Sequence, residues 1–154
     1  MTTITTLPTT RIAAAAPLQA TLVELIDLAL QGKQAHWTVT GPFFKPLHEH
    51  LDALVDDART WYDDVAERLA ALDVAPDGRV ATVEAGTPIP ALAAGWEAGE
   101  DVVRAFTDRL DALAGRLEAR IVALGDPDPV SQDLLIGIAH AVEKHAWMFR
   151  AQGR

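Results

Sequence analysis

The stretch PLHEHLDALVDDARTWYDDVAERLAAL, residues 46–72, carries the strongest periodic signal in the chain. Its apolar residues return at alternating steps of three and four, the spacing of an amphipathic helix with one buried stripe. Pro46 suits a first helical turn, where a missing N–H costs nothing, and turn-forming residues follow at 73–78. The spacing therefore predicts one helix of about 40 Å, at ~1.5 Å per residue.

A second stripe on this helix is polar and contains His48, Asp52, Asp63 and Glu67. Residues four apart project from one side of a helix, so His48 pairs with Asp52 and Asp63 with Glu67. Asp52 and Asp63 are separated by almost a whole number of turns, which keeps both pairs on one face. The pairs are nevertheless about 16 Å apart along the axis, whereas ligands lie within ~2.0–2.6 Å of a metal ion. One copy of the helix cannot close one site with all four residues.

Imidazole and carboxylate donors suit a ferrous or ferric ion, because soft thiolates would favour zinc or iron–sulfur clusters. The chain contains no cysteine. Each acidic residue alone is explained more simply by a solvated helix face, and His48 alone by a surface histidine. His36 strengthens the metal interpretation, because it lies on the core side of the preceding helix and a short turn brings it beside His48. A core histidine without a ligand role is the alternative for His36. Lys33, one turn earlier, could reach the same site as a neighbouring cation or be solvated, and the solvated side chain is the favoured expectation.

The run from Lys33 to Leu72 resembles the signature of the Dps proteins, the ferritin-like miniferritins of starved and stressed bacteria. The shared pattern is His-Trp, a histidine twelve residues after the first, Asp four residues later, and Asp-x-x-x-Glu eleven residues beyond that Asp. A weaker match covers Glu143–Ala151. The resemblance implies a hollow dodecamer of four-helix bundles that oxidises Fe(II) to Fe(III), preferably with hydrogen peroxide, and stores ferric mineral. It also implies a ferroxidase centre whose catalytic, metal-binding residues are His36, His48, Asp52, Asp63 and Glu67.

The other periodic segments complete an all-α, four-helix bundle. We expect further long helices at residues 17–39, 91–124 and 129–151, the third with Leu92 and Trp96 pointing inward.

Three prolines and two glycines interrupt residues 73–90, so this segment is expected to be a long crossover with at most a short helix near Ala81–Ala85. A long crossover between the second and third helices is one feature of ferritin-like folds.

Length and composition agree with one domain. A chain of 154 residues with 49% hydrophobic and 6% aromatic residues suits helices rich in Ala and Leu. We expect the Thr- and Ala-rich residues 1–16 to form a flexible arm and residues 17–154 to form the bundle. No secretory signal pattern is present, and nothing approaches the ~18 apolar residues of a membrane span. With the absence of cysteine, this predicts a cytoplasmic location, with nucleoid association left open.

The formal net charge of −9 is the wrong sign for a general phosphate-binding surface and the right sign for attracting cations. Dps relatives that bind DNA through a tail use one rich in Lys and Arg, whereas residues 1–16 contain one Arg and the other end offers Arg150 and Arg154. The competing hypothesis of a nucleoid scaffold that compacts DNA without iron is therefore weakened, and a folded DNA-binding patch stays open. An organic-cofactor enzyme has no Gly-rich loop or nucleophile motif to support it.

Asp126, Asp128 and Asp133 surround the turn before the last helix. In Dps proteins acidic residues near this junction line threefold pores for iron entry, so the resemblance makes these three candidates for that role. The competing explanation is turn and capping chemistry, with Asp128 or Ser131 as the N-cap. His140 and His145 do not share a helix face, which argues against a ligand pair.

The gap between the two ligand pairs leads to a prediction about assembly. If two copies of the 46–72 helix run antiparallel about a twofold axis, Asp52 faces Asp63 of the partner subunit, and the same register brings His48 to Glu67 of the partner subunit. Each dimer would then hold two equivalent sites, with His36, His48 and Asp52 from one chain and the two other carboxylates from its partner. We therefore expect a homo-oligomer built from twofold dimers.

Overall fold

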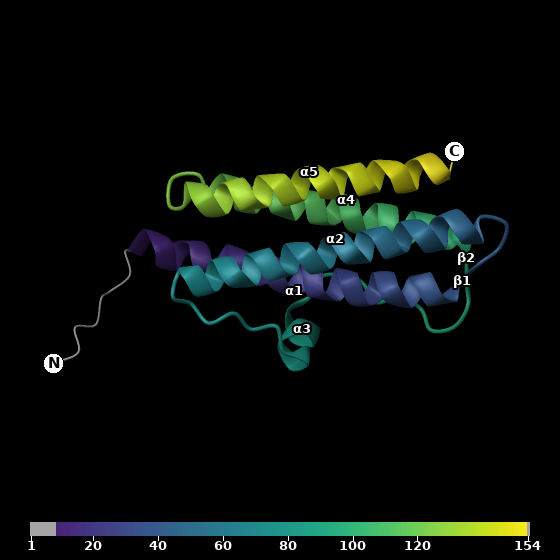
Figure 1. Ribbon diagram of the computed structural model, residues 1–154, viewed down its shortest axis with the longest axis horizontal. Helices are drawn as coiled ribbons and strands as arrows, with labels where there is room; N and C mark the ends of the chain where they lie inside the picture. Colours follow the sequence, from purple (N-terminus) through teal and green to yellow (C-terminus); the bar gives the residue numbers. More distant parts are fainter. Residues whose placement is uncertain (1–8, 154) are drawn as a thin grey trace.

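The structure is a computed structural model that describes residues 9–153, with side chains from residue 14 onward. Its four long helices form an elongated bundle (Figure 1) and are α1 (Thr9–Thr38), α2 (Phe44–Ala71), α4 (Gly99–Leu124) and α5 (Pro129–Gln152). α1 and α2 form one antiparallel pair and α4 and α5 the other, and a crossover containing α3 (Val80–Gly86) joins the pairs. The predicted four-helix bundle, its crossover and the short helix within it are confirmed.

Large apolar side chains fill the space between the helices along the whole bundle. Phe106 of α4 and Phe149 of α5 are fully buried, with ring centroids 5.6 Å apart. Gly32 lets α1 and α2 approach closely, because a Cβ there would lie 2.8 Å from Val55 Cγ2. Each fully buried leucine contributes ~1.5–3 kcal/mol relative to exposure. The predicted buried stripe of α2 is confirmed at Leu47, Leu51, Leu54, Ala58, Val65 and Leu69.

The first helix begins earlier than the sequence analysis predicts. α1 starts at Thr9, so residues 9–16 of the expected flexible arm are helical, and Pro17 lies inside the helix rather than at its first position. Four consecutive alanines precede Pro17, and their high helix propensity offsets the backbone hydrogen bond that proline removes. The rest of the expected arm, residues 1–8, lies outside the described residues.

The predicted start of the third long helix is wrong. α4 begins at Gly99, and residues 91–96 are irregular and lead into β2 (Glu97–Ala98), which pairs in parallel with β1 (Val39–Thr40). Gly95 has a φ of 102°, a conformation that favours glycine and ends any helical continuation. Trp96, expected to point inward, is 79% exposed, whereas Leu92 is partly buried against the core.

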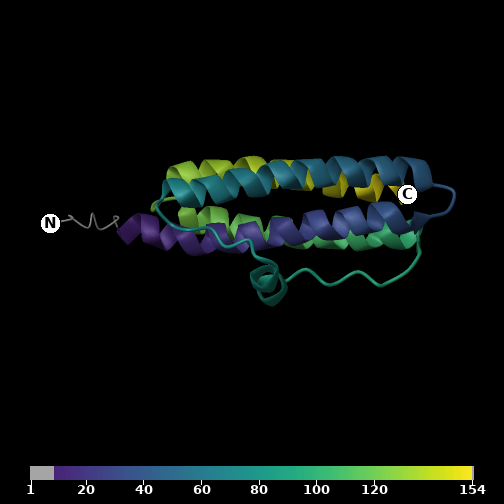
Figure 2. The same ribbon diagram turned by 60° about the horizontal axis from the view of Figure 1, so that its bottom comes forward.

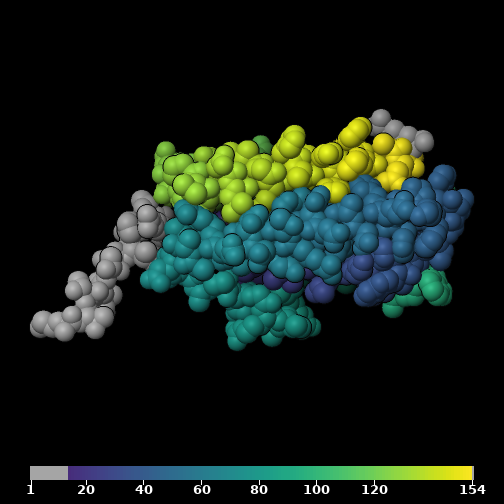
Figure 3. Space-filling model, in the orientation of Figure 1, coloured from purple at the N-terminus to yellow at the C-terminus, as the bar shows by residue number. Residues whose placement is uncertain are grey.

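The crossover lies against one side of the bundle (Figure 2), and α3 forms a separate bulge beneath α1 and α2 in the space-filling view (Figure 3). Asp27 of α1 accepts hydrogen bonds from Gln31 Nε2 at 3.0 Å and from Thr87 Oγ1 at 2.6 Å, so α1 holds the segment after α3 in place. Among residues 9–153, no helix is both long enough and apolar enough to cross a membrane.

Candidate metal centre

His36 and His48 come together beside the turn that joins α1 to α2. Their rings stack with centroids 3.6 Å apart and an interplanar angle of 21°. His36 Nδ1 lies 2.7 Å from the backbone oxygen of His48, and His48 Nδ1 lies 2.8 Å from the backbone oxygen of His36. Because a carbonyl oxygen only accepts, each Nδ1 carries a proton and donates it. This reciprocal pair fixes both rings and leaves Nε2 of each imidazole as the nitrogen available to a metal.

Asp52 lies one helical turn beyond His48 and faces the same rings. Its Oδ1 is 3.9 Å from His36 Nδ1, and the ammonium of Lys33 contacts the same oxygen from α1. The hydrogen bond from Lys33 is the main reason that the pKa of Asp52 is lowered, which keeps the carboxylate ionised. Lys33 therefore reaches this cluster, contrary to the expectation that it is solvated. Its spacing of three residues from His36 is the signal that indicates this contact.

Asp63 and Glu67 are exposed on α2, farther along the same helix. They lie about 16 Å or more from Asp52 by helical rise, so the five predicted ligands do not meet within one chain. Within residues 9–153, no three His, Asp or Glu side chains converge as a metal site. We call His36, His48 and Asp52 the histidine half-site, and Asp63 and Glu67 the carboxylate half-site.

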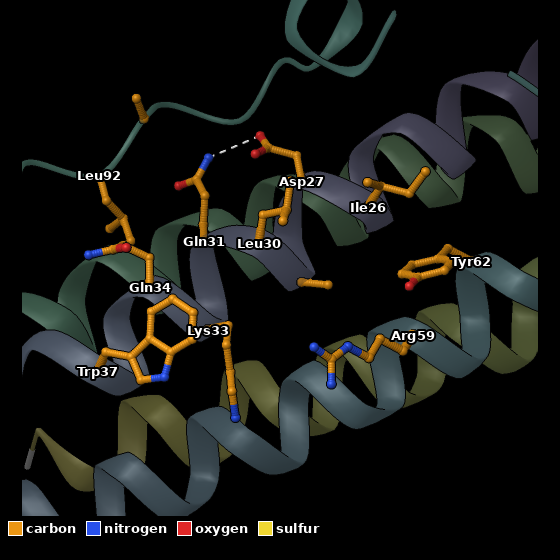
Figure 4. Close-up of a pocket in the computed structure, with 12 residues that line it drawn as sticks. Ile26, Asp27, Leu30, Gln31, Lys33, Gln34, Trp37, Arg59, Tyr62 and Leu92 are labelled. Carbon is orange, nitrogen blue, oxygen red and sulfur yellow. Dashed lines mark hydrogen bonds between the residues drawn. The ribbon is translucent and has the colours of Figure 1, made fainter. Parts of the chain in front are cut away.

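A groove of 630 Å³ opens beside the histidine half-site, between α1, α2 and the crossover (Figure 4). Lys33 and Trp37 line it from α1, and Arg59 and Tyr62 line it from α2. Trp37 and Leu30, which also lines the groove, are each 61% exposed. Large apolar side chains exposed together mark a contact surface rather than a solvated face. The groove is therefore suited to receive another polypeptide.

The three acidic residues near the last turn have different environments. Asp128 is buried, and its two oxygens accept hydrogen bonds from Arg68 Nη2, both at 2.8 Å. It also caps α5 by accepting from the backbone N–H of Ser131 at 3.2 Å. Burial opposes ionisation of Asp128, but the hydrogen bonds from Ser131 and Arg68 outweigh it and lower its pKa. Asp128 is thus engaged as a helix cap, whereas Asp126 and Asp133 are exposed.

A second histidine cluster, which the sequence analysis missed, lies between α2 and α5. His50 Nε2 is 3.0 Å from His145 Nδ1, and His145 Nε2 is 2.8 Å from Asp57 Oδ2. Gln152 Nε2 donates to His50 Nδ1 at 2.9 Å. One set of neutral tautomers satisfies every contact, with both histidines protonated at Nε2. Burial lowers the pKa of His50 to about 4, so this ring is neutral near pH 7. The seven-residue spacing of His50 and Asp57 places them on one face and is the signal for this cluster.

Comparisons with known proteins show the family to which the chain belongs. Residues 15–154 match the family model described as a ferritin-like domain, so the chain belongs to the ferritin-like proteins. Within that class it is a member of the Dps family. It is 36% identical to DNA protection during starvation protein 2 of Deinococcus radiodurans over 87% of the chain, and spans 56% of that relative, little more than half its length. It is 37% identical to DNA protection during starvation protein of Mycolicibacterium smegmatis over 87% of the chain and 73% of the relative.

Solved structures show the same fold. Dps92 from Deinococcus radiodurans superposes with a TM-score of 0.91 at 33% identity, over 94% of this chain and 87% of that one. Dps from Microbacterium arborescens in its high iron form superposes with a TM-score of 0.89 at 36% identity, over 94% of this chain and 95% of that one. The resemblance first seen in residues 33–72 is confirmed at the level of the family.

Proposed function

We propose that the protein is an iron-storage and detoxification ferroxidase, which oxidises Fe(II) with hydrogen peroxide or dioxygen and keeps the ferric mineral in a protein shell. The observation that carries the proposal is the histidine half-site, where two fixed imidazoles and an ionised carboxylate gather beside an open groove. Imidazole nitrogen and carboxylate oxygen accept both ferrous and ferric ions. A related Dps from Microbacterium arborescens is described in a high iron form, which supports iron as the substrate.

The iron site is proposed to form between two subunits. One chain offers a histidine half-site and a carboxylate half-site that lie too far apart to share an ion, because helical rise separates them by about 16 Å. A twofold axis with antiparallel α2 helices would place each histidine half-site opposite the carboxylate half-site of the other copy. The groove beside Trp37 gives the second copy a surface on which to dock. Because the chain belongs to the Dps family, the proposed assembly is a shell of twelve such subunits.

The proposed reaction needs positioning and charge from the protein rather than a protein nucleophile. Each hydrogen peroxide takes two electrons, one from each of two ferrous ions, and with two water molecules yields two FeO(OH) units and four protons. The imidazoles and carboxylates would bind and orient the ferrous ions, and the carboxylate charge favours the ferric product. The net charge of −9 per subunit would raise the local concentration of Fe(II).

The test compares the wild-type protein with a His36→Ala, Asp63→Ala double variant, which damages both half-sites. Metal-free protein is mixed anaerobically with Fe(II), hydrogen peroxide is added, and the loss of Fe(II) is followed together with the rise in ferric absorbance. His140→Ala is the matched control, because His140 is exposed on α5 and belongs to neither half-site. We expect the control to match wild type and the double variant to fall to the rate of iron in buffer. Equal rates in all three proteins would remove the enzyme interpretation.

The alternative function is a scaffold that protects or compacts DNA, and the names of the relatives from Deinococcus and Mycolicibacterium favour it. The net charge of −9 opposes it, because phosphate binding depends on basic residues and weakens steeply with salt. The two functions do not exclude each other in one shell. A ferroxidase-dead variant that still retarded DNA would separate them.

A further inference from the structure

A buried cation on α4 is held by neutral acceptors. Arg109 is 9% exposed, and its guanidinium donates to three neutral acceptors: Gln31 Oε1 at 3.2 Å, Ala105 O at 2.9 Å and Pro90 O at 2.7 Å. Among the described side chains, no Asp or Glu forms an ion pair with it. Burial lowers the pKa of Arg109, although the charges of Glu97, Asp27 and Asp108 partly oppose this. A buried charge without a carboxylate in direct contact is costly, so this position favours an anion.

A second guanidinium lies on the same face of α4. Arg116 follows Arg109 by seven residues, almost two helical turns, and its Nε donates to both oxygens of Glu24, at 3.0 and 3.1 Å. Arg120 donates to the same carboxylate at 2.6 Å. Two guanidinium groups thus share one carboxylate whose side chain is only 1% exposed, which leaves one positive charge in excess. Within the described residues, the terminal N–H groups of Arg116 make no hydrogen bond.

Both arginines line a pocket of 390 Å³ between α4 and the crossover. Ala112 lines the pocket between them on α4, and Pro88–Pro90 forms the wall on the crossover side. The wall is held in place because Arg109 binds the backbone oxygen of Pro90. Asp108 supplies the single carboxylate of the lining, so the pocket carries a net positive charge in a chain whose net charge is −9.

We propose that this pocket binds a phosphate-class anion, either free phosphate or the phosphoryl group of a small metabolite, with Arg116 as the main contact and Arg109 as a fixed source of charge. The planar guanidinium presents paired N–H donors that match phosphoryl oxygens, and charge-assisted hydrogen bonds of this kind are among the strongest in proteins. A dianion would offset the charge of Arg109 together with the excess charge beside Glu24. The pocket shares no residue with either half-site, so the anion-binding proposal can hold or fail independently of the ferroxidase proposal.

Binding is measured by isothermal titration calorimetry on the assembled, full-length, chelator-treated protein, so that no iron captures the phosphate. Inorganic phosphate and glycerol phosphate are titrated separately at matched ionic strength in chloride. We expect saturable binding to wild type and about tenfold weaker binding, or ~1.4 kcal/mol, to Arg116→Gln. Tighter binding of glycerol phosphate would assign the site to a phosphorylated metabolite, and equal or tighter binding of inorganic phosphate to the free anion.

Two further variants separate a built site from diffuse charge. Arg104→Gln removes another arginine of α4, one that pairs with Asp101 at 3.2 Å, and should bind phosphate as wild type does. Asp108→Asn removes the opposing carboxylate of the pocket and should bind more tightly. If Arg116→Gln does not assemble, Arg116→Lys keeps the charge beside Glu24 without the planar fork and should bind more weakly than wild type. The absence of saturable binding to wild type, or equal losses in the Arg104 and Arg116 variants, would overturn the proposal.

Discussion

Replacing Asp128 with Ala distinguishes two possible roles of this residue, as the N-cap of α5 and as a part of the iron-entry route. The change removes the N-cap of α5, which costs about 1 kcal/mol. It also leaves the Arg68 guanidinium, whose side chain is 22% exposed, without its two 2.8 Å contacts. The loss of hydrogen bonds to a charged group adds roughly 1.5–3 kcal/mol. The structure therefore predicts that the free energy of unfolding falls by about 3 kcal/mol.

For a chain of this size, each kcal/mol shifts the unfolding midpoint by roughly 2–4 °C, so the expected decrease is about 6–12 °C. Thermal unfolding of the metal-free protein, followed by circular dichroism at one protein concentration and scan rate, measures it. Asp133→Ala is the matched control, because Asp133 is an exposed carboxylate near the start of the same helix. It should shift the midpoint by less than about 2 °C. A small shift of the unfolding midpoint for Asp128→Ala, combined with slow iron uptake, would refute the capping argument and indicate that Asp128 acts in iron entry.

Three other outcomes follow from the structure. Burial lowers the pKa of His50 from 6.5 to about 4. As pH is lowered, His50 therefore binds a proton in the unfolded chain before it does so in the folded chain, and the unfolding free energy should fall between about pH 6.5 and pH 4. The loss is on the order of 1–2 kcal/mol after discounting for partial exposure, and denaturant unfolding of His50→Gln should show a smaller decrease over that range. Replacing exposed Asp126 and Asp133 with Asn should slow iron uptake at low salt without changing the assembly, because clustered carboxylates concentrate cations; uptake at the wild-type rate would place entry elsewhere. In gel-retardation assays at ~0.15 M salt, DNA should not be retarded, and a retarded band that survives chelator would reveal a local patch that outweighs the net charge of −9.

Much of the fold follows from local sequence pattern, and each of the two errors in helix bounds has an identifiable physical cause. α2 was predictable because its buried leucines recur at helical spacing and turn residues mark its end. The predicted start of α1 at residue 17 is wrong because proline is common in the first turn of a helix, whereas the alanines before Pro17 extend this one. The start of α4 was wrong because residues 91–98 have helical spacing. Glu97 and Ala98 instead form a strand, because they pair with Val39 and Thr40, a contact between distant parts of the chain.

The site was predictable in its parts and not in its detailed geometry. The short turn after His36 was enough to bring it beside His48, but the donation of each Nδ1 to the other's backbone oxygen depends on the packing of two helices. His50 and His145 are separated by 95 residues, so no local spacing relates them. The location of the carboxylate half-site relative to the histidine half-site depends on a second chain and is a prediction that assembly must test.

Subunit mixing tests the central claim, that one iron site is shared by two chains. His48→Ala and Glu67→Ala proteins, each inactive alone, are unfolded together in equal amounts, reassembled, and assayed for peroxide-dependent Fe(II) oxidation. In a mixed dimer one site carries both lesions and the other is intact, so random pairing should restore about one quarter of the wild-type sites. Mass spectrometry of the reassembled particles establishes that mixed dimers form, and each variant reassembled alone sets the baseline. Activity near one quarter of wild type is the predicted result, and baseline activity despite proven mixed dimers would show that each chain builds its own site.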